Sequence, residues 1–369
     1  MRLKKLKINN FRNFSEGEVN INDGTTVFYG AMGEGKTNLI EAVYLLSVGR
    51  SYRTNDTNQV ISWGEKEAYV RGEGKNSTGN FAVAIKLTKD GKRIELNGEQ
   101  SKKSIELIGG LRSVIFHSED VGIVAGAPHV RRRYIDIAIS QASRNYAYNL
   151  RDYYRILKQR NSVLAKYPHS GAGEWDDQLS TVGAWLTQVR AKVLSEISQI
   201  SSSFIGTLVG EERNFSIKYI PAGDENPEKI KLLLSKTLTL DMARGSTSVG
   251  PHRDDFKIYL DSAEARYFAS SGEKKTIALA LKLAEMEFMR GVTGEKPILL
   301  LDDVFSALDL SCAKRLLNVT EDGSQCIITL SDLNPLREEF SREALFYEVD
   351  SGRVIPSPRS GIIGKIRQP

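Results

Sequence analysis

The feature that most constrains the fold is a glycine-rich segment of eight residues, Gly30-Ala31-Met32-Gly33-Glu34-Gly35-Lys36-Thr37. A glycine, four further residues and Gly-Lys-Thr is the spacing of a phosphate-binding loop. An apolar strand is predicted at 26–29, and an apolar-periodic helix is predicted from Asn38 onward. Backbone N–H groups in such a loop can surround phosphate oxygens at the positive end of the helix. This context favours a nucleotide site over the alternative, a glycine turn that precedes a chance lysine.

The same loop predicts which groups hold a nucleotide. Lys36 neutralises β- and γ-phosphate oxygens, and the Thr37 hydroxyl is a ligand for Mg²⁺. We expect contacts to ATP from the loop and the residue that follows it, namely Gly30, Ala31, Met32, Gly33, Glu34, Gly35, Lys36, Thr37 and Asn38.

A second element of such a site is an apolar strand that ends in a carboxylate. The run at 298–301 is entirely aliphatic and is followed by Asp302 and Asp303. We expect Asp302 to hold Mg²⁺ together with Thr37, and Asp303 to orient or deprotonate the attacking water. Many ABC-type ATPases have a glutamate at the position of Asp303. The shorter aspartate therefore predicts slow hydrolysis. The alternative for the whole run is a buried strand with a polar exit.

The distance between these two elements indicates an inserted lobe. Lys36 and Asp302 are 266 residues apart (302 minus 36), far more than a small kinase or GTPase needs. This is the arrangement of ABC-type ATPases, in which a Ser-Gly motif at a helix start reaches the γ-phosphate held by the opposite subunit. Ser270, Ser271 and Gly272 lie about 30 residues before Asp302 and open an apolar helix. The alternative is an ordinary serine N-cap.

The periodicity of the chain supports an α/β fold. The first 110 residues have strand and turn patterns with one helix, residues 146–164 and 179–200 have helical periodicity, and the last third alternates strands and helices. We therefore predict a P-loop ABC-type ATPase core, a mixed sheet with crossover helices, that carries an inserted, mainly helical lobe. The expected boundaries are 1–115 for the first part of the core, 116–270 for the lobe with the Ser-Gly motif at its end, and 271–369 for the rest of the core.

Composition restricts the class of protein. Forty percent apolar and 26% charged residues are ordinary for a folded chain, and two cysteines are too few for a disulfide framework. Neither a signal peptide nor an 18-residue apolar run is present, so we expect a cytoplasmic protein without a membrane partner. The formal net charge of +5 permits a nucleic-acid partner without requiring one.

Several further segments resemble the motifs of the RecF family, the bacterial DNA repair and recombination ATPases related to the heads of SMC proteins. The resemblance covers essentially the whole chain. It rests on Phe11-Arg12-Asn13-Phe14, the loop with 37–42, Ser51-Tyr52-Arg53-Thr54, 116–120, Gly126-Ala127-Pro128, Arg131-Arg132-Arg133, Lys158-Gln159-Arg160-Asn161, 250–255, 270–273 and 279–285.

The resemblance implies a specific activity and partners. It implies an ATPase with weak, DNA-stimulated hydrolysis that binds ATP, Mg²⁺ and double-stranded or gapped DNA, and that works with RecO and RecR to load recombinase. It also implies that Arg12 and Asn13 lie near the nucleotide, although Arg12 alone reads equally as an exposed charge at a strand end. The arginine run 131–133 is more typical of ion pairs or a solvated face than of a DNA contact, and the His252 segment is more typical of a structural role than of a metal site.

The mechanism expected from these residues is an ATP-gated clamp. Two chains enclose two nucleotides, and Ser270, Ser271 and Gly272 of each chain close the loop of the other. Two rivals remain open at this point. One is a nucleotide-controlled scaffold with incidental hydrolysis, and the other is a transporter-type ATPase subunit, which ordinarily has a switch histidine after the strand at 326–330 that this chain lacks.

Overall fold

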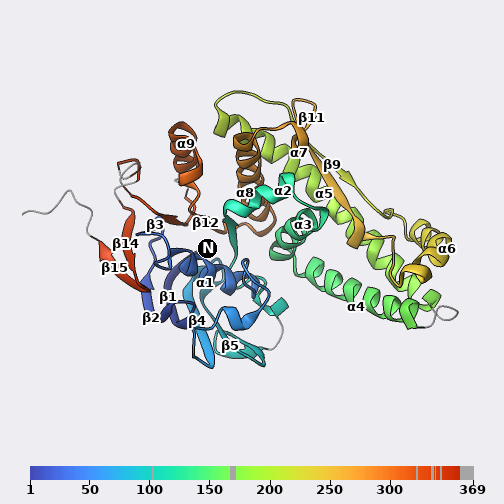
Figure 1. Ribbon diagram of the computed structural model, residues 1–369, viewed down its shortest axis with the longest axis horizontal. Helices are drawn as coiled ribbons and strands as arrows, with labels where there is room; N and C mark the ends of the chain where they lie inside the picture. The colour runs from blue at the N-terminus through green and yellow to red at the C-terminus, as the bar shows by residue number, and fades with distance from the viewer. Residues whose placement is uncertain are drawn as a thin grey trace, which may run out of the picture. The chain divides into compact units, whose positions relative to one another are not determined.

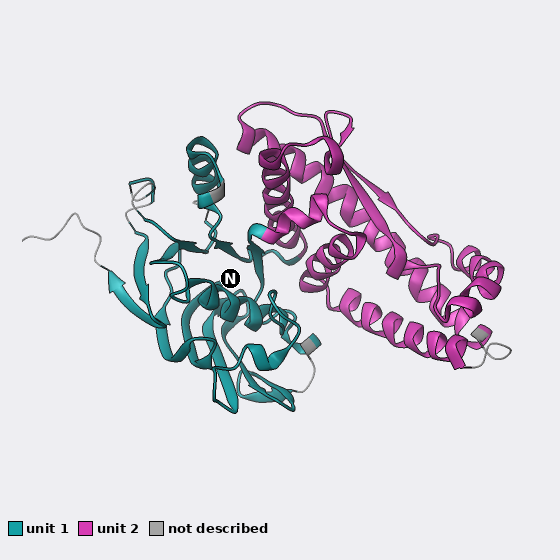
Figure 2. Ribbon diagram, in the orientation of Figure 1, with its two compact units in different colours: residues 1–118, 293–369 teal, residues 119–292 magenta. Residues whose placement is uncertain are grey.

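A computed structural model of the chain describes residues 1–101, 104–166, 172–320, 323–333, 336, 338–340 and 343–357 (Figure 1). The chain divides into two compact units (Figure 2). Unit 1 comprises residues 1–118 and 293–369, and unit 2 comprises residues 119–292. The second unit is thus inserted into the sequence of the first, as the spacing of Lys36 and Asp302 predicts.

The first sheet of unit 1 is antiparallel, with the strand order β2-β1-β4-β5-β6-β7. In β1 the apolar side chains of Leu6 and Ile8 are buried, while Lys5 and Lys7, which alternate with them, reach the outer face, as a half-buried strand requires. Tight turns at Gly91 and at Asn97-Gly98, all with positive φ, close two hairpins. The strands are β1 (Arg2–Phe11), β2 (Phe14–Asn20), β4 (Glu67–Asn76), β5 (Gly79–Thr88), β6 (Gly91–Leu96) and β7 (Glu99–Ser101).

The second sheet of unit 1 has the order β15-β14-β3-β13-β12-β8. Its strands pair in parallel except at β15, so the sheet is mixed, as predicted. Helix α1 contacts strands of both sheets, and its apolar side chains join one buried core with them. The elements are β3 (Thr25–Tyr29), α1 (Lys36–Val48), β8 (Ser113–Phe116), β12 (Ile298–Asp302), α9 (Leu310–Thr320), β13 (Cys326–Leu330), β14 (Leu345–Asp350) and β15 (Arg353–Ser357).

Unit 2 is mainly helical, with a three-stranded antiparallel sheet in the order β11-β10-β9. The two long helices expected from the periodicity are α4 and α5, which pack against each other (Figure 1). The elements are α2 (Gly122–Ala125), α3 (Pro128–Ala142), α4 (Arg144–Lys166), α5 (Asp176–Val209), β9 (Phe215–Ile220), α6 (Pro227–Arg244), β10 (Asp255–Leu260), β11 (Ala263–Glu264), α7 (Ala265–Phe268) and α8 (Ser271–Thr293).

Short 3₁₀ turns complete the chain. They are η1 (Thr57–Gln59), η2 (Ser104–Leu107), η3 (Ser118–Val121), η4 (Ala172–Trp175), η5 (Pro251–Arg253) and η6 (Phe305–Ala307). Among the residues that the structure describes, no helix combines the length and apolar character that crossing a membrane requires.

The boundaries differ from the expected ones at both junctions, since residues 116–118, which we assigned to the lobe, belong to unit 1. Residues 271–292, which we assigned to the ATPase core, belong to unit 2. Helix α8 contacts other parts of that unit, and its Lys282 ammonium group lies 3.7 Å from the Asp120 carboxylate. The Tyr134 hydroxyl on α3, for example, donates a hydrogen bond of 2.9 Å to the carbonyl of Leu281.

Candidate nucleotide site

The glycine-rich loop connects the carboxyl end of β3 to the first turn of α1. Gly30, Gly33 and Gly35 have φ values of 150°, 89° and 113°, a region that side-chain-bearing residues rarely adopt. A Cβ atom on Gly35 would also lie 2.6 Å from Oδ1 of Asn13. The glycines therefore allow both the backbone curvature of the loop and the close approach of its neighbours.

The Lys36 ammonium group lies over its own loop. Its Nζ atom donates to the carbonyl oxygens of Gly30 at 2.8 Å and Ala31 at 2.7 Å. Burial lowers the pKa of Lys36, and the carboxylates of Asp303, Asp302 and Glu34 oppose this effect. A lysine held at a loop of backbone N–H groups provides the positive charge that a polyphosphate requires.

The Asp302 carboxylate accepts three hydroxyl hydrogen bonds at the carboxyl end of β12. Its Oδ1 atom accepts from the Thr37 hydroxyl at 2.8 Å and from the Thr329 hydroxyl at 2.8 Å. Its Oδ2 atom accepts from the Tyr52 hydroxyl at 2.9 Å. The structure thus brings together Thr37 and Asp302, the two groups that we expected to bind Mg²⁺.

Asp303 follows with an exposed side chain and a backbone held in the left-handed region, at φ 50°. Its N–H donates to the Thr329 hydroxyl at 2.9 Å, so Thr329 contacts both aspartates of the pair. A non-glycine residue with positive φ is uncommon and is typical of functional sites. The Asp303 carboxylate also opposes the lowering of the Lys36 pKa, so it lies beside the loop.

Tyr52 and Thr329 are site residues whose contacts we did not predict. Thr329 pairs in register with Asp302 across β12 and β13, which identifies it once the strand alignment is known. Tyr52 lies in the segment after α1, where its ring contacts Tyr44 and His117. Burial, and then the neighbouring Asp302 carboxylate, raises the pKa of Tyr52 well above its ordinary value. The Tyr52 hydroxyl therefore remains a donor throughout the physiological pH range.

Arg12 lies beside the site and is held by a buried carboxylate. Its guanidinium group makes a two-point contact with Glu41 on α1, at 2.9 and 2.6 Å. Glu41 is completely buried and also accepts from Ser51 at 2.5 Å and from Arg53 at 3.2 Å. Arg12 is therefore part of an ion-pair cluster that joins the turn after β1, helix α1 and the segment at 51–53, rather than an isolated charge at a strand end.

Asn13 and Asn38 contact the loop or its neighbours directly. The Asn13 amide donates to the carbonyl of Glu34 at 2.8 Å, and the Asn38 amide donates to Oδ1 of Asn13 at 2.8 Å. On the other side, the N–H of Gly352 donates to the Glu34 carbonyl at 3.1 Å. Met32, by contrast, projects into solvent with 86% of its surface exposed. The loop is thus fixed at Glu34 while its tip is open.

Ser270, Ser271 and Gly272 are exposed at the start of α8 in unit 2. Ser270 and Glu273 form a reciprocal capping arrangement, in which the Ser270 N–H donates to the Glu273 carboxylate at 2.8 Å and the Glu273 N–H donates to the Ser270 hydroxyl at 3.2 Å. The N-cap alternative is therefore present in the structure. It leaves the remaining N–H groups of the first turn available for an anion.

The donor set fits Mg²⁺ bound jointly with a phosphate. Among the described residues, no group of three or more histidine, cysteine or acidic side chains could hold a metal ion alone. One threonine hydroxyl and one carboxylate, 2.8 Å apart at the mouth of a phosphate loop, are the few oxygen ligands that Mg²⁺ takes from a protein when phosphates and water supply the rest.

Comparisons with known proteins agree with this geometry. A family model described as RecF/RecN/SMC N terminal domain matches residues 2–345. The DNA replication and repair protein RecF of Clostridium novyi is 34% identical over 360 residues, which is 96% of this chain and 99% of that protein. The corresponding protein of Caldanaerobacter subterraneus is 37% identical over 343 residues, 89% of this chain and 94% of that protein.

Solved structures show the same relationship. The recombination mediator protein RecF with ATP is 35% identical, with a TM-score of 0.88 over 96% of this chain and 99% of that chain. The Smc head domain from Pyrococcus furiosus, 18% identical with a TM-score of 0.58 over 96% of this chain and 95% of that chain, shares the fold. This chain therefore belongs to the RecF family, and its fold is that of an ABC-type P-loop ATPase.

Proposed function

We propose that this chain is an ATP-dependent DNA-binding protein of recombinational repair and replication, which closes as a homodimer when ATP binds. The observation that carries the proposal is the 2.8 Å hydrogen bond between Thr37 and Asp302, residues 265 positions apart. This hydrogen bond joins the phosphate loop to the strand that ends in the carboxylate, although the inserted unit separates the two in the sequence. Nucleotide hydrolysis needs these two elements side by side.

The roles of the site residues follow from their positions. Lys36 and the loop N–H groups hold the phosphates, and Thr37 and Asp302 hold Mg²⁺, which when bound neutralises charge on the β- and γ-phosphates. Asp303, exposed beside Asp302, orients or deprotonates the attacking water. Because its side chain is short, hydrolysis is slow. The dimer that ATP binding closes therefore stays closed for longer than two chains that merely collide.

The second chain completes the site. Ser270, Ser271 and Gly272 present the exposed start of a 23-residue helix, which suits contact with the γ-phosphate bound by a partner copy. Arg12 and Asn13 support the loop from within the same chain through Glu41 and Glu34.

The partners that we propose are double-stranded DNA near single-strand gaps, and RecR together with RecO. The support comes from the relatives, which include a DNA replication and repair protein and a recombination mediator protein in the RecFOR pathway. Hydrolysis stimulated by DNA would release the closed state after recombinase is loaded.

The first test uses Asp303→Asn, which keeps the size of the side chain and removes its charge. We expect the variant to bind ATP, to hydrolyse it at least about tenfold more slowly, and to remain dimeric, because the proposed water-activating group is lost while the phosphate ligands remain. Light scattering with saturating ATP and Mg²⁺ measures the mass. Asp90→Asn, an exposed aspartate in the β5–β6 turn, is the matched control. A monomer for both the wild type and Asp303→Asn would contradict the proposal.

A further inference from the structure

Helix α4 has an inner face that is fixed by buried polar side chains. Tyr146, Tyr153 and Arg160 are spaced seven residues apart, and all three are essentially inaccessible to solvent. Side chains at this spacing lie on one face of a helix. Each of them makes a polar contact with a different part of unit 2, so the helix is held along most of its length.

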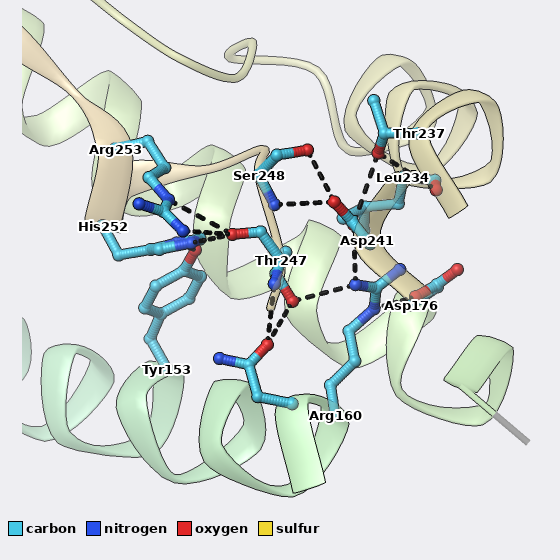
Figure 3. A network of polar contacts seen from close by, with 11 residues as sticks. Tyr153, Arg160, Asp176, Leu234, Thr237, Asp241, Thr247, Ser248, His252 and Arg253 are labelled. Carbon is cyan, nitrogen blue, oxygen red and sulfur yellow. Dashed lines mark hydrogen bonds and ion pairs between the residues drawn. The ribbon is translucent and has the colours of Figure 1, made fainter. Parts of the chain in front are cut away.

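The contacts at the distal half of α4 are drawn in Figure 3. Arg160 donates to Asp176 at 2.8 Å, to Asp241 at 3.1 Å and to the Thr247 hydroxyl at 2.8 Å. The next residue, Asn161, accepts from the Thr247 N–H at 2.8 Å. Buried ion pairs with further hydrogen bonds favour one geometry over others, which suits a fixed helix.

The proximal half is held in the same way. The Tyr146 hydroxyl donates to Asp136 of α3 at 2.6 Å and accepts from Arg190 of α5 at 3.0 Å. Arg190 in turn pairs with Asp136 at 2.7 Å. Hydrogen bonds and ion pairs thus hold helix α4 against its neighbouring helices at both ends of its inner face.

The outer face of α4 is exposed and basic. Arg144, Tyr148, Arg151, Arg155 and Lys158 follow one another at intervals of four, three, four and three residues, and all of them are exposed. We call these five residues the basic face of α4. Half of the Arg151 side chain and 62% of the Arg155 side chain are accessible to solvent.

The charge of this helix is unusual for the chain. Helix α4 contains six lysines and arginines and one acidic residue, a formal net charge of +5, which equals that of the entire chain. The remaining residues therefore sum to zero formal charge. The single acid, Asp152, contacts Arg151 at 3.4 Å and Arg155 at 3.7 Å on the same exposed surface, where such pairs contribute little.

Aromatic side chains accompany the cations. Tyr148 and Tyr154 expose 40% and 43% of their surface, and the Arg151 guanidinium lies 5.1 Å from the centre of the Tyr148 ring. Tyrosine hydroxyls and arginines are common donors to phosphate oxygens, and they bind without reading sequence. Because these tyrosines are exposed, packing in the hydrophobic core does not explain why aromatic residues stand at these positions.

We propose that the basic face of α4 binds the sugar-phosphate backbone of duplex DNA. From Arg144 to Lys158 it extends over about 21 Å at about 1.5 Å per residue, long enough to meet several successive phosphates. This inference deepens the proposed function, because it assigns the DNA contact to a specific surface. A rigid helix with a line of cations is complementary in charge and length to a duplex backbone, and the buried inner face keeps that line in register.

The experiment removes three charges from this surface in the full-length chain, with Arg151→Gln, Arg155→Gln and Lys158→Gln combined. Glutamine has a helix propensity close to that of arginine and lysine, and the three sites are exposed, so folding is expected to be unchanged. The matched control is Lys5→Gln, Lys7→Gln and Lys86→Gln, which removes the same charge from the outer face of the antiparallel sheet in unit 1. A third variant, Arg151→Lys, Arg155→Lys and Lys158→Arg, keeps every charge.

The measurement is the affinity for duplex DNA as a function of salt, with ATP and Mg²⁺ present. We expect the glutamine variant to lose at least about tenfold in affinity at about 0.1 M salt, and the slope of log affinity against log salt to fall by about 2 to 3. The sheet control and the charge-keeping variant are expected to match the wild type. ATP-dependent dimerisation is expected to be unchanged in all of them.

Equal affinity and slope for the wild type and the glutamine variant would overturn this inference while leaving the proposed function intact. Loss of DNA binding in the wild type itself would instead contradict the proposed function. Competition by polyglutamate as effective as that of DNA, at equal charge, would also overturn the inference, because it would assign the surface to acidic partners in general.

Discussion

At the scale of single residues, the central feature is that hydroxyl groups donate hydrogen bonds to both oxygens of the Asp302 carboxylate. Thr37 and Thr329 occupy one oxygen and Tyr52 occupies the other, so the plane of the carboxylate is fixed before a metal ion or nucleotide arrives. Preorganised ligands lower the cost of binding, because little reorganisation remains to be done. Tyr52 contacts the carboxylate and, through its ring, the helix that follows the phosphate loop.

A prediction follows for the Tyr52 hydroxyl. Tyr52→Phe keeps the ring and removes one hydrogen bond to a charged group, a loss of about 1.5 kcal/mol and therefore about tenfold in the Mg²⁺ concentration that half-saturates nucleotide binding. A fluorescent ATP analogue titrated with Mg²⁺ measures this, and binding without Mg²⁺ is expected to be unchanged. Tyr347→Phe is the control, because that hydroxyl donates to the Asn20 carbonyl on another part of unit 1. Equal Mg²⁺ dependence in the wild type and both variants would contradict the role.

Much of the site was predictable from the sequence because its signals are local. The phosphate loop, Thr37 and Asp302 each stand in a short pattern whose neighbours fix the conformation. Tyr52 and Thr329 could not be predicted in the same way. Their contacts depend on the register between β12 and β13, and on how the segment after α1 folds back over the sheet, and neither property is encoded in a short stretch of sequence.

At the scale of elements, α4 is a helix whose inner side is polar and whose outer side is basic. His252 supports the inner side between α4 and the loop that precedes β10 (Figure 3). Its Nε2 atom lies 2.9 Å from the Thr247 carbonyl and must donate, so Nδ1 of the neutral ring accepts from the Tyr153 hydroxyl at 2.8 Å. Burial lowers the pKa of His252 to about 4. Both ring nitrogens of this histidine are thus engaged in hydrogen bonds within unit 2, as a structural role requires.

The lowered pKa gives a pH dependence with a definite sign. Between about pH 6.5 and pH 4 the unfolded chain binds a proton at His252 that the folded chain does not, so stability is fully present above pH 6.5 and is lost as the pH falls. From pH 7.5 to pH 5.5 the loss is about 1 kcal/mol, or a few degrees in the thermal midpoint. We expect His252→Gln to lose less stability than the wild type over this range. An identical pH dependence of unfolding in both proteins would contradict the assignment.

Elements with strong periodicity were predictable, and short edge elements were not. Helices α4, α5 and α8 and strands β12 and β13 lie close to their expected positions. Strands β8 and β15 were not expected, because four or five residues carry too little pattern to distinguish a strand from a loop. The expected lobe boundary at residue 270 also differs from the structure, since the packing of α8 within unit 2 is a tertiary property.

The charge of α4 illustrates a different limit. A net charge of +5 is small for a chain of 369 residues, so by itself it does not indicate a DNA-binding surface. Only the helical geometry places Arg151, Arg155 and Lys158 on one exposed face, opposite the buried Tyr153 and Arg160.

At the scale of the whole molecule, one ATPase core carries one inserted unit, and the clamp that we propose takes one half of the nucleotide site from each of them. The loop with Lys36 belongs to unit 1, and the exposed helix start at Ser271 belongs to unit 2. In the proposed clamp each half meets its complement on a second chain. Closure then brings two copies of the basic face of α4 into one assembly, which doubles the number of phosphate contacts and couples DNA affinity to ATP.

The most direct test of this account measures the stoichiometry of chain and DNA in one experiment. Sedimentation velocity with a labelled duplex of about 30 base pairs, at about 0.1 M salt, reports the mass of the DNA-bound species with and without ATP and Mg²⁺. We expect two chains on each duplex with ATP and Mg²⁺, and at least about tenfold weaker binding without them. One chain on each duplex, at an affinity that ATP does not change, would contradict it.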